Sequence, residues 1–155
     1  MTLIKTKTLY DRDFALWIDE TTKKLKSGDF SQVDLENLIE EVEALGKRDR
    51  KTLKSHLRTL FEHALKRAYV VNFPECYRGW EVTINRTLSD IEDILDDSPS
   101  LRNFVKDNYL KCYKKAMENV QIEYDVDFPE VFPFSDDMDK LLDDRLFWKN
   151  IKTNR

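Results

Sequence analysis

The feature that most constrains the fold of this 155-residue sequence is an amphipathic segment that runs from Asp34 to Val71 without interruption. Its apolar residues recur every three or four positions, so on a helix they gather in one stripe along the whole segment. Asp34 is a suitable N-cap, because its carboxylate can accept the free amide of Asn37 or Leu38. Gly46 lies within the stripe, but no turn residues follow it. The pattern therefore predicts one long helix over 34–71, bent at most near Gly46. The predicted stripe comprises Leu35, Leu38, Ile39, Val42, Leu45, Leu53, Leu57, Leu60, Ala64, Ala68 and Val71.

Few turn-forming residues accompany this helix, since the chain has only 3 glycines and 4 prolines. All-β folds use such residues heavily, so their scarcity favours long helices with short connections. Apolar periodicity predicts further helices over 11–25, 80–96 and 99–120, with Ser98 as the cap of the last. We therefore predict an all-α fold in a single domain over 1–155. Its core is an up-and-down four-helix bundle, preceded by a loose lead-in over 1–9.

The C-terminal part, residues 125–155, has a different character. Two Phe-Pro steps, at Phe128 and Phe132, disfavour helix and hold the chain extended. The pattern predicts an extended strap over 125–134 whose aromatic side chains pack along the bundle. A short helix over 136–143, capped by Ser135, is expected to follow, and Phe147 and Trp148 are expected to close one end of the bundle.

Charge and cysteine content exclude several functional classes. The net charge is −4, with 26 basic and 30 acidic residues, so no global pull toward DNA, RNA or an anionic membrane is expected. The two cysteines, Cys76 and Cys112, are too few for a secreted disulfide scaffold and are expected to be reduced thiols of a cytoplasmic protein. No apolar run approaches the length of a membrane span or a signal peptide. Phosphate-binding, dinucleotide-binding and zinc motifs are missing from the sequence, so no cofactor is expected.

Several stretches together resemble a bacterial family, abundant in cyanobacteria, that is known as domain of unknown function number twenty-nine. The resemblance covers about Tyr10 to Trp148, and it implies an all-helical fold but no catalytic residue. One departure is Arg67, because the family usually has an aromatic residue after the lysine that corresponds to Lys66. The stretches that carry the resemblance are Tyr10–Trp17, Asp34–Gly46, His63–Lys66, Trp80–Ile84, Asp97–Arg102 and Phe132–Phe134 with Phe147 and Trp148.

The only two histidines, His56 and His63, lie on one edge of the apolar stripe and are candidate metal ligands. Their seven-residue spacing puts them about 10 Å apart along a helix, too far to share an ion with bonds of about 2 Å. A metal site would therefore need ligands from another helix. Histidines hydrogen-bonded at the edge of the core are the alternative interpretation.

Arg58 and His63 match the Arg-x4-His motif of the HEPN ribonucleases, which are also helical bundles. That resemblance would make the pair catalytic: His63 would move the 2′-hydroxyl proton, and Arg58 would stabilise charge on the phosphorus centre. Five residues along one helix separate two side chains by about 140°, which makes the pairing awkward in one subunit. We retain a metal-independent ribonuclease as the alternative function, with RNA as a partner only in that case.

The long helix is also a candidate partner-binding surface. Glu36, Glu40 and Glu43 form a carboxylate row beside the apolar stripe, whereas the second half of the helix is basic and includes Arg58. A helix of about 38 residues spans roughly 55 Å, more than its neighbours can cover, and uncovered apolar surface usually meets a partner. The leading hypothesis is thus a cytoplasmic interaction module without catalysis, which binds another protein or forms a homodimer through this helix.

Overall fold

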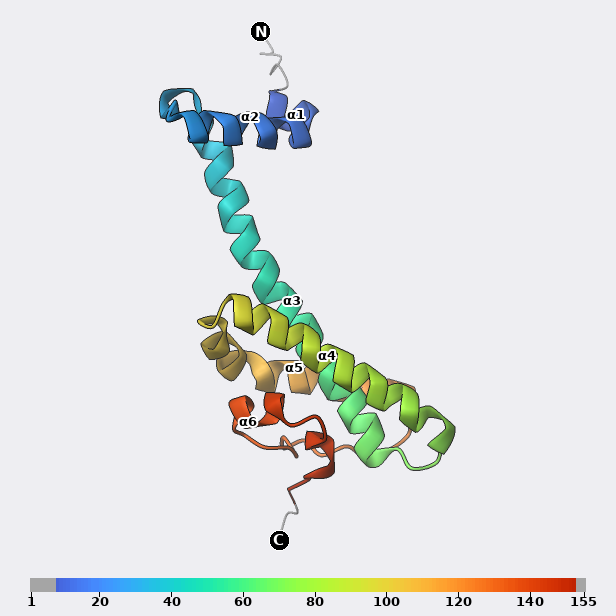
Figure 1. Cartoon of the computed structure of the whole chain (residues 1–155). Coiled ribbons are helices and arrows are strands. Elements are labelled where there is room, and N and C mark those ends of the chain that lie inside the picture. The colour runs from blue at the N-terminus through green and yellow to red at the C-terminus, as the bar shows by residue number, and fades with distance from the viewer. Residues whose placement is uncertain (1–7, 153–155) are drawn as a thin grey trace. The chain divides into compact units, whose positions relative to one another are not determined.

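The computed structural model describes residues 8–152, and all regular secondary structure in that range is helical (Figure 1). The prediction of an all-α fold with one long helix is therefore confirmed. By its internal contacts the chain divides into two compact units, an N-terminal unit (Met1–Lys47) and a C-terminal unit (Arg48–Arg155). Each is described by itself below. None of the helices within 8–152 combines the length and the apolar character that a membrane span requires.

The N-terminal unit contains α1 (Leu9–Arg12), α2 (Phe14–Ser27), a 3-10 turn η1 (Phe30–Gln32) and the start of α3. The helix predicted over 11–25 is thus divided, because Asp13 adopts an extended conformation and caps α2. The Asp13 carboxylate accepts a hydrogen bond from the Leu16 amide at 3.0 Å. At the other end of α2, Gly28 has φ of 77°, a left-handed conformation that terminates helices readily.

The long helix α3 extends over Leu35–Tyr69 as one element and passes through Gly46 without a break. Its predicted cap is confirmed, since an Asp34 carboxylate oxygen accepts the Asn37 amide at 3.3 Å. Its predicted stripe is only half buried. Leu35, Ile39, Val42 and Leu45 face solvent and Leu38 is half-buried. In contrast, Leu53, Leu57 and Leu60 are fully buried. Phe61 and Leu65, which the stripe did not include, are fully buried as well.

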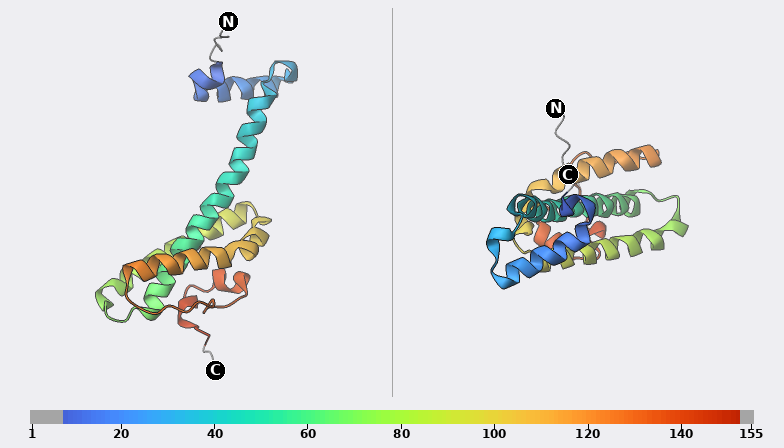
Figure 2. Two further views of the ribbon diagram at one scale, coloured as in Figure 1. Left: turned by 180° about the vertical axis from the view of Figure 1, so that it is seen from behind. Right: turned by 90° about the horizontal axis from the view of Figure 1, so that it is seen from above.

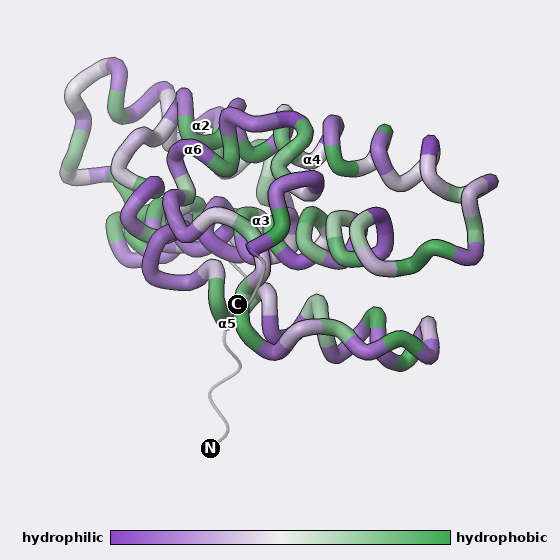
Figure 3. Tube along the Cα trace, turned by 90° about the horizontal axis from the view of Figure 1, so that it is seen from below, coloured by the Kyte–Doolittle hydropathy of each residue, from purple (hydrophilic) through white to green (hydrophobic). Residues whose placement is uncertain are grey.

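In the C-terminal unit, the second half of α3 packs with α4 (Tyr77–Asp97) and α5 (Leu101–Glu123). The views agree that α3 lies between α4 and α5, with successive helices running in opposite directions (Figure 2). Figure 3 shows the alternation of hydrophobic and hydrophilic residues along α4 and α5 that this packing requires. The tight connection through η2 (Pro74–Cys76) is consistent with antiparallel neighbours in a bundle.

The predicted strap is confirmed. Residues 125–137 form no helix, and the side chains of Phe128, Phe132 and Phe134 are buried against the bundle. Phe132 makes edge-to-face contacts with Phe61 at 5.3 Å and with Tyr113 at 5.1 Å between ring centroids. The chain then forms α6 (Met138–Asp143) and the turn η3 (Phe147–Lys149). Phe147 and Trp148 are buried, as expected.

Three predicted helix starts in this unit were wrong by two or three residues. Helix α4 begins at Tyr77 and includes Gly79, where an added Cβ would meet no atom within 4 Å, so no close packing contact requires a glycine there. Helix α5 begins at Leu101, because the Ser98 carbonyl oxygen accepts the Leu101 amide in a preceding turn. Helix α6 is capped by Asp137, which accepts the Lys140 amide at 3.3 Å, and Ser135 instead accepts the amide of Asp137.

Candidate functional site

The surface of the N-terminal unit carries a row of uncovered apolar side chains along α3, which we call the apolar row. It consists of Leu35, Ile39, Val42 and Leu45, whose exposed fractions are 56%, 55%, 59% and 54%. Their spacing of four, three and three residues places them on one helical face over three turns. Isolated exposed leucines are ordinary on protein surfaces, but four neighbours on one face form a contiguous patch.

The interior of the N-terminal unit is small by comparison. Within its described residues, 8–47, only Trp17 and Thr21 are buried. The Trp17 ring makes an edge contact with Tyr10 at 4.9 Å and stacks on Phe14 at 5.8 Å. A single buried apolar side chain is far less than an independent folding unit needs. The apolar surface of this unit therefore lies mainly on its outside.

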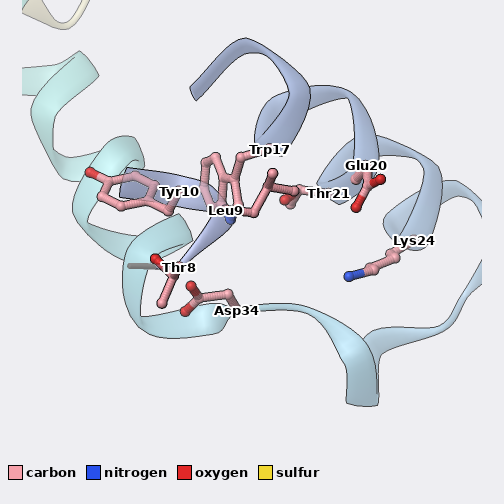
Figure 4. A pocket seen from close by; sticks show the side chains of 8 residues that line it. All are labelled: Thr8, Leu9, Tyr10, Trp17, Glu20, Thr21, Lys24 and Asp34. Atoms are coloured by element: carbon pink, nitrogen blue, oxygen red, sulfur yellow. The ribbon is translucent and has the colours of Figure 1, made fainter. Parts of the chain in front are cut away.

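A hollow of about 230 Å³ lies beside Trp17 in the same unit. Figure 4 shows its lining, in which Tyr10 comes from α1, Trp17 from α2 and Asp34 from the residue before α3. The hydroxyl of Tyr10 donates a hydrogen bond to the Glu41 carboxylate. This bond to an anion, together with burial, raises the pKa of Tyr10 to about 12. Tyr10 thus ties α1 to one edge of α3 and is not set up to lose a proton.

The opposite edge of the apolar row carries the predicted carboxylates. Glu36, Glu40 and Glu43 are all exposed, and none of them forms an ion pair with any residue in the range 8–152. The structure therefore places this row of negative charge next to uncovered apolar surface. An arrangement of this kind matches the electrostatic and apolar requirements for binding a basic amphipathic helix.

The pair suggested by the ribonuclease motif has different surroundings in the C-terminal unit. Arg58 lines a hollow with residues of α5, among them Cys112. His63 instead has its Nδ1 atom 2.8 Å from the Thr59 carbonyl oxygen and lies near Lys66 and Glu123. No contact joins the two side chains within the described chain, as the 140° separation along a helix leads one to expect.

A metal site at His56 or His63 would need further ligands, and the fold brings none to either histidine among the described residues. Across residues 8–152, no three side chains of His, Cys, Asp or Glu are grouped so that they could hold a metal ion. His63 lies near the ion pair that Lys66 of α3 forms with Glu123 of α5, with 3.3 Å between nitrogen and oxygen. Lys66 is nearly buried and its ammonium also lies over the Trp80 ring.

Burial lowers the pKa of His63 below its ordinary value of 6.5, and the positive charge of Lys66 acts in the same direction. The hydrogen bond to Thr59 and the nearby carboxylates oppose this shift without cancelling it. As the pH falls below about 6.5, the His63 imidazole becomes protonated in the unfolded chain but stays neutral in the folded chain. The free energy of unfolding therefore decreases as the pH falls.

We therefore expect the melting temperature to decrease between about pH 7 and pH 5, and the decrease to be smaller in His63→Gln. Thermal unfolding of both proteins, followed by circular dichroism across this range, measures the difference. Equal slopes in the two proteins would show that His63 does not titrate differently on folding.

The sequence did not reveal the structural role of Arg67, although this residue departs from the pattern of the family that the sequence resembles. Its guanidinium lies 4.2 Å from the ring centroid of Tyr77 and 4.4 Å from that of Trp148. Its Nε atom also donates to Glu81 at 2.7 Å. A flat cation can fill a slot between two rings as an aromatic side chain would. Arg67 thus joins α3, α4 and the C-terminal segment, which is a structural role.

The model of a family described as Domain of unknown function DUF29 matches residues 9–147 of the chain. The match covers most of each of the two units described above. No curated protein and no solved structure matches the sequence.

Proposed function

We propose, from the premise that this chain belongs to the Domain of unknown function DUF29 family, that it is a cytoplasmic helical interaction module without catalysis of its own. In this proposal the apolar row binds an amphipathic helix of another protein. The observation that carries it is the imbalance within the N-terminal unit. Four apolar side chains of one helical face are each more than half exposed, while among residues 8–47 a single apolar side chain, Trp17, is buried. Covering the row would remove a substantial apolar area from water, and apolar burial is the main driving force of association.

Charge indicates the kind of helix that fits. The carboxylates of Glu36, Glu40 and Glu43 would lie beside one flank of any helix seated on the apolar row. A partner helix with Leu-like residues every three or four positions and Lys or Arg on its flanks would bury the row and pair with these carboxylates.

Self-association through the row is disfavoured by the same charges. In an antiparallel pair, the flank that carries Glu40 and Glu43 would lie beside the same flank of the second copy. In a parallel pair it would lie beside the other flank, which carries Glu41. Both orientations bring carboxylates together, and like charges at such positions are destabilising. A basic partner helix meets no such repulsion.

The test uses two synthetic peptides of about 18 residues, long enough for several helical turns. Both carry leucine at helical spacing, and their flanks are lysine in one and glutamate in the other. We expect the full-length protein to bind the lysine peptide with a Kd on the order of 10 µM and the glutamate peptide much more weakly. Val42→Asp should weaken the binding of the lysine peptide at least about 30-fold, because it puts a charge in the middle of the apolar contact.

The matched control is Ile122→Asp, since Ile122 is an 88% exposed apolar residue of the other unit. It should leave binding unchanged. An equal effect of the two substitutions would contradict the proposal. Dimerisation at tens of micromolar that Val42→Asp abolishes would assign the row to a second copy instead. Cleavage of mixed RNA that His63→Ala abolishes would replace the module by the ribonuclease that Arg58 and His63 suggest.

A further inference from the structure

A second feature lies in the C-terminal unit, where α3 and α5 enclose a hollow of about 110 Å³. Its lining consists of Lys54 and Arg58 from α3, and Lys111, Cys112 and Lys115 from α5. Each helix contributes two cations four positions apart, and such residues share one helical face. Four positive charges therefore converge on one small space, and no carboxylate belongs to its lining.

What sets these four cations apart from the other basic residues of the unit is that they line one hollow together. Six cations elsewhere in the unit form ion pairs with carboxylates at 4 Å or less, and they are Lys66, Arg67, Arg102, Lys106, Arg145 and Lys152. No carboxylate of residues 8–152 pairs in this way with Lys54, Arg58, Lys111 or Lys115. Some other cations of the unit, such as Lys114 and Lys149, also form no ion pair in the described range, but they do not line this hollow. Unpaired cations held close together repel one another, and an anion placed among them would remove that cost.

The inner wall of the hollow is formed by Cys112, which is only 4% exposed. Burial raises the pKa of its thiol, and the charges of Arg58, Lys54 and Lys115 act in the opposite direction. Three of the four cations are therefore close enough to influence the same sulfur atom. The thiol stays protonated and neutral, so the inner wall adds no negative charge and the cations keep their capacity for a ligand.

Size and charge identify the ligand class. A hollow of about 110 Å³ is several times smaller than the roughly 300–1,000 Å³ of pockets that enclose whole drug-sized molecules. It can hold a single tetrahedral anion. Arg58 is half-buried and offers a planar fork of donors that suits phosphate oxygens, while lysines act as point charges. We propose that Lys54, Arg58, Lys111 and Lys115 bind the phosphate group of a small phosphorylated molecule. This inference does not depend on the apolar row.

The test is isothermal titration of the full-length protein with inorganic phosphate and, separately, with glycerol 3-phosphate as a monoester. The informative variant is Lys115→Gln, and its matched control is Lys114→Gln. Lys114 precedes it on the same helix but lines a different hollow, with Leu110 and Glu130. Circular dichroism melting of both variants establishes that they fold. Arg58→Gln provides an independent second variant.

We expect saturable binding of both phosphate compounds that weakens as chloride is raised. Lys115→Gln and Arg58→Gln should each weaken it about tenfold, because each removes one hydrogen bond from a charged donor. Lys114→Gln should change it less than twofold. Equal losses in Lys114→Gln and Lys115→Gln, or no saturable binding, would overturn the proposal. Binding of an RNA oligonucleotide that needs the four cations but is not displaced by glycerol 3-phosphate would also overturn it, in favour of a phosphodiester surface.

Discussion

Replacing Phe61 with alanine is expected to lower the free energy of unfolding of the C-terminal unit by about 3–5 kcal/mol. The Phe61 side chain is 0% exposed. Its ring contacts Tyr113 of α5 at 6.2 Å and Phe132 of the strap at 5.3 Å between centroids. Alanine would leave a cavity where three segments meet, and both the lost burial and the cavity destabilise the fold.

The effect should extend along the strap. Phe132 also contacts Phe134 at 5.6 Å, and Phe134 contacts Phe147 at 5.1 Å, so these rings form a continuous chain. Urea unfolding followed by circular dichroism measures the loss, with Ile122→Ala as the control at an exposed position. The control should change stability by less than about 0.5 kcal/mol. A loss below about 1 kcal/mol for Phe61→Ala would show that this junction is not the centre of the core.

The helical pattern of the sequence was sufficient for the existence of α3, its cap at Asp34 and its continuity past Gly46. Those properties depend on local hydrogen bonding and on the period of the apolar residues, and both are determined by residues close together in the sequence. The burial of Phe61 and Leu65 was not predicted, because it depends on how α3 packs against other helices. These two residues lie at one edge of the stripe, and a helix placed between α4 and α5 buries a wider arc than a stripe of one helix suggests.

The same pattern could not show which half of the stripe is covered. Leu45 and Leu53 are equivalent by period and hydropathy, yet Leu45 is 54% exposed and Leu53 is 0% exposed. The difference arises because Leu53 belongs to the C-terminal unit, in which α4 and α5 pack against α3, whereas Leu45 belongs to the N-terminal unit. Whether the two units act as the single domain predicted over 1–155 stays a prediction.

The candidate sites divide in a similar way. The carboxylates Glu36, Glu40 and Glu43 could be found from sequence, because they and the apolar row lie on one helix. The cationic hollow could not, since Lys111 and Lys115 are more than 50 positions from Arg58 and only the packing of α5 on α3 brings them together. The separation of Arg58 from His63 was foreseeable, because it follows from helical geometry alone.

The second large expected effect concerns amide hydrogen exchange along α3. The helical segment 53–65 is anchored in the core by Leu53, Leu57, Leu60 and Phe61. Its amides should therefore exchange only through global unfolding, which costs about 5–15 kcal/mol in ordinary domains. Residues 35–45 form helix with little tertiary support, and short unsupported helices are marginal in water. Their amides should exchange at least about 1,000 times faster than those of residues 53–65.

Hydrogen exchange of the free protein, resolved to single amides and repeated with the lysine-flanked peptide, is the most direct test of the uncovered apolar row. We expect weak protection of residues 35–45 in the free protein and strong protection once the peptide is bound, with residues 53–65 unchanged. Strong protection of both segments in the free protein would mean that the chain already covers Leu35, Ile39, Val42 and Leu45 by itself, and the reason for a partner helix would be gone.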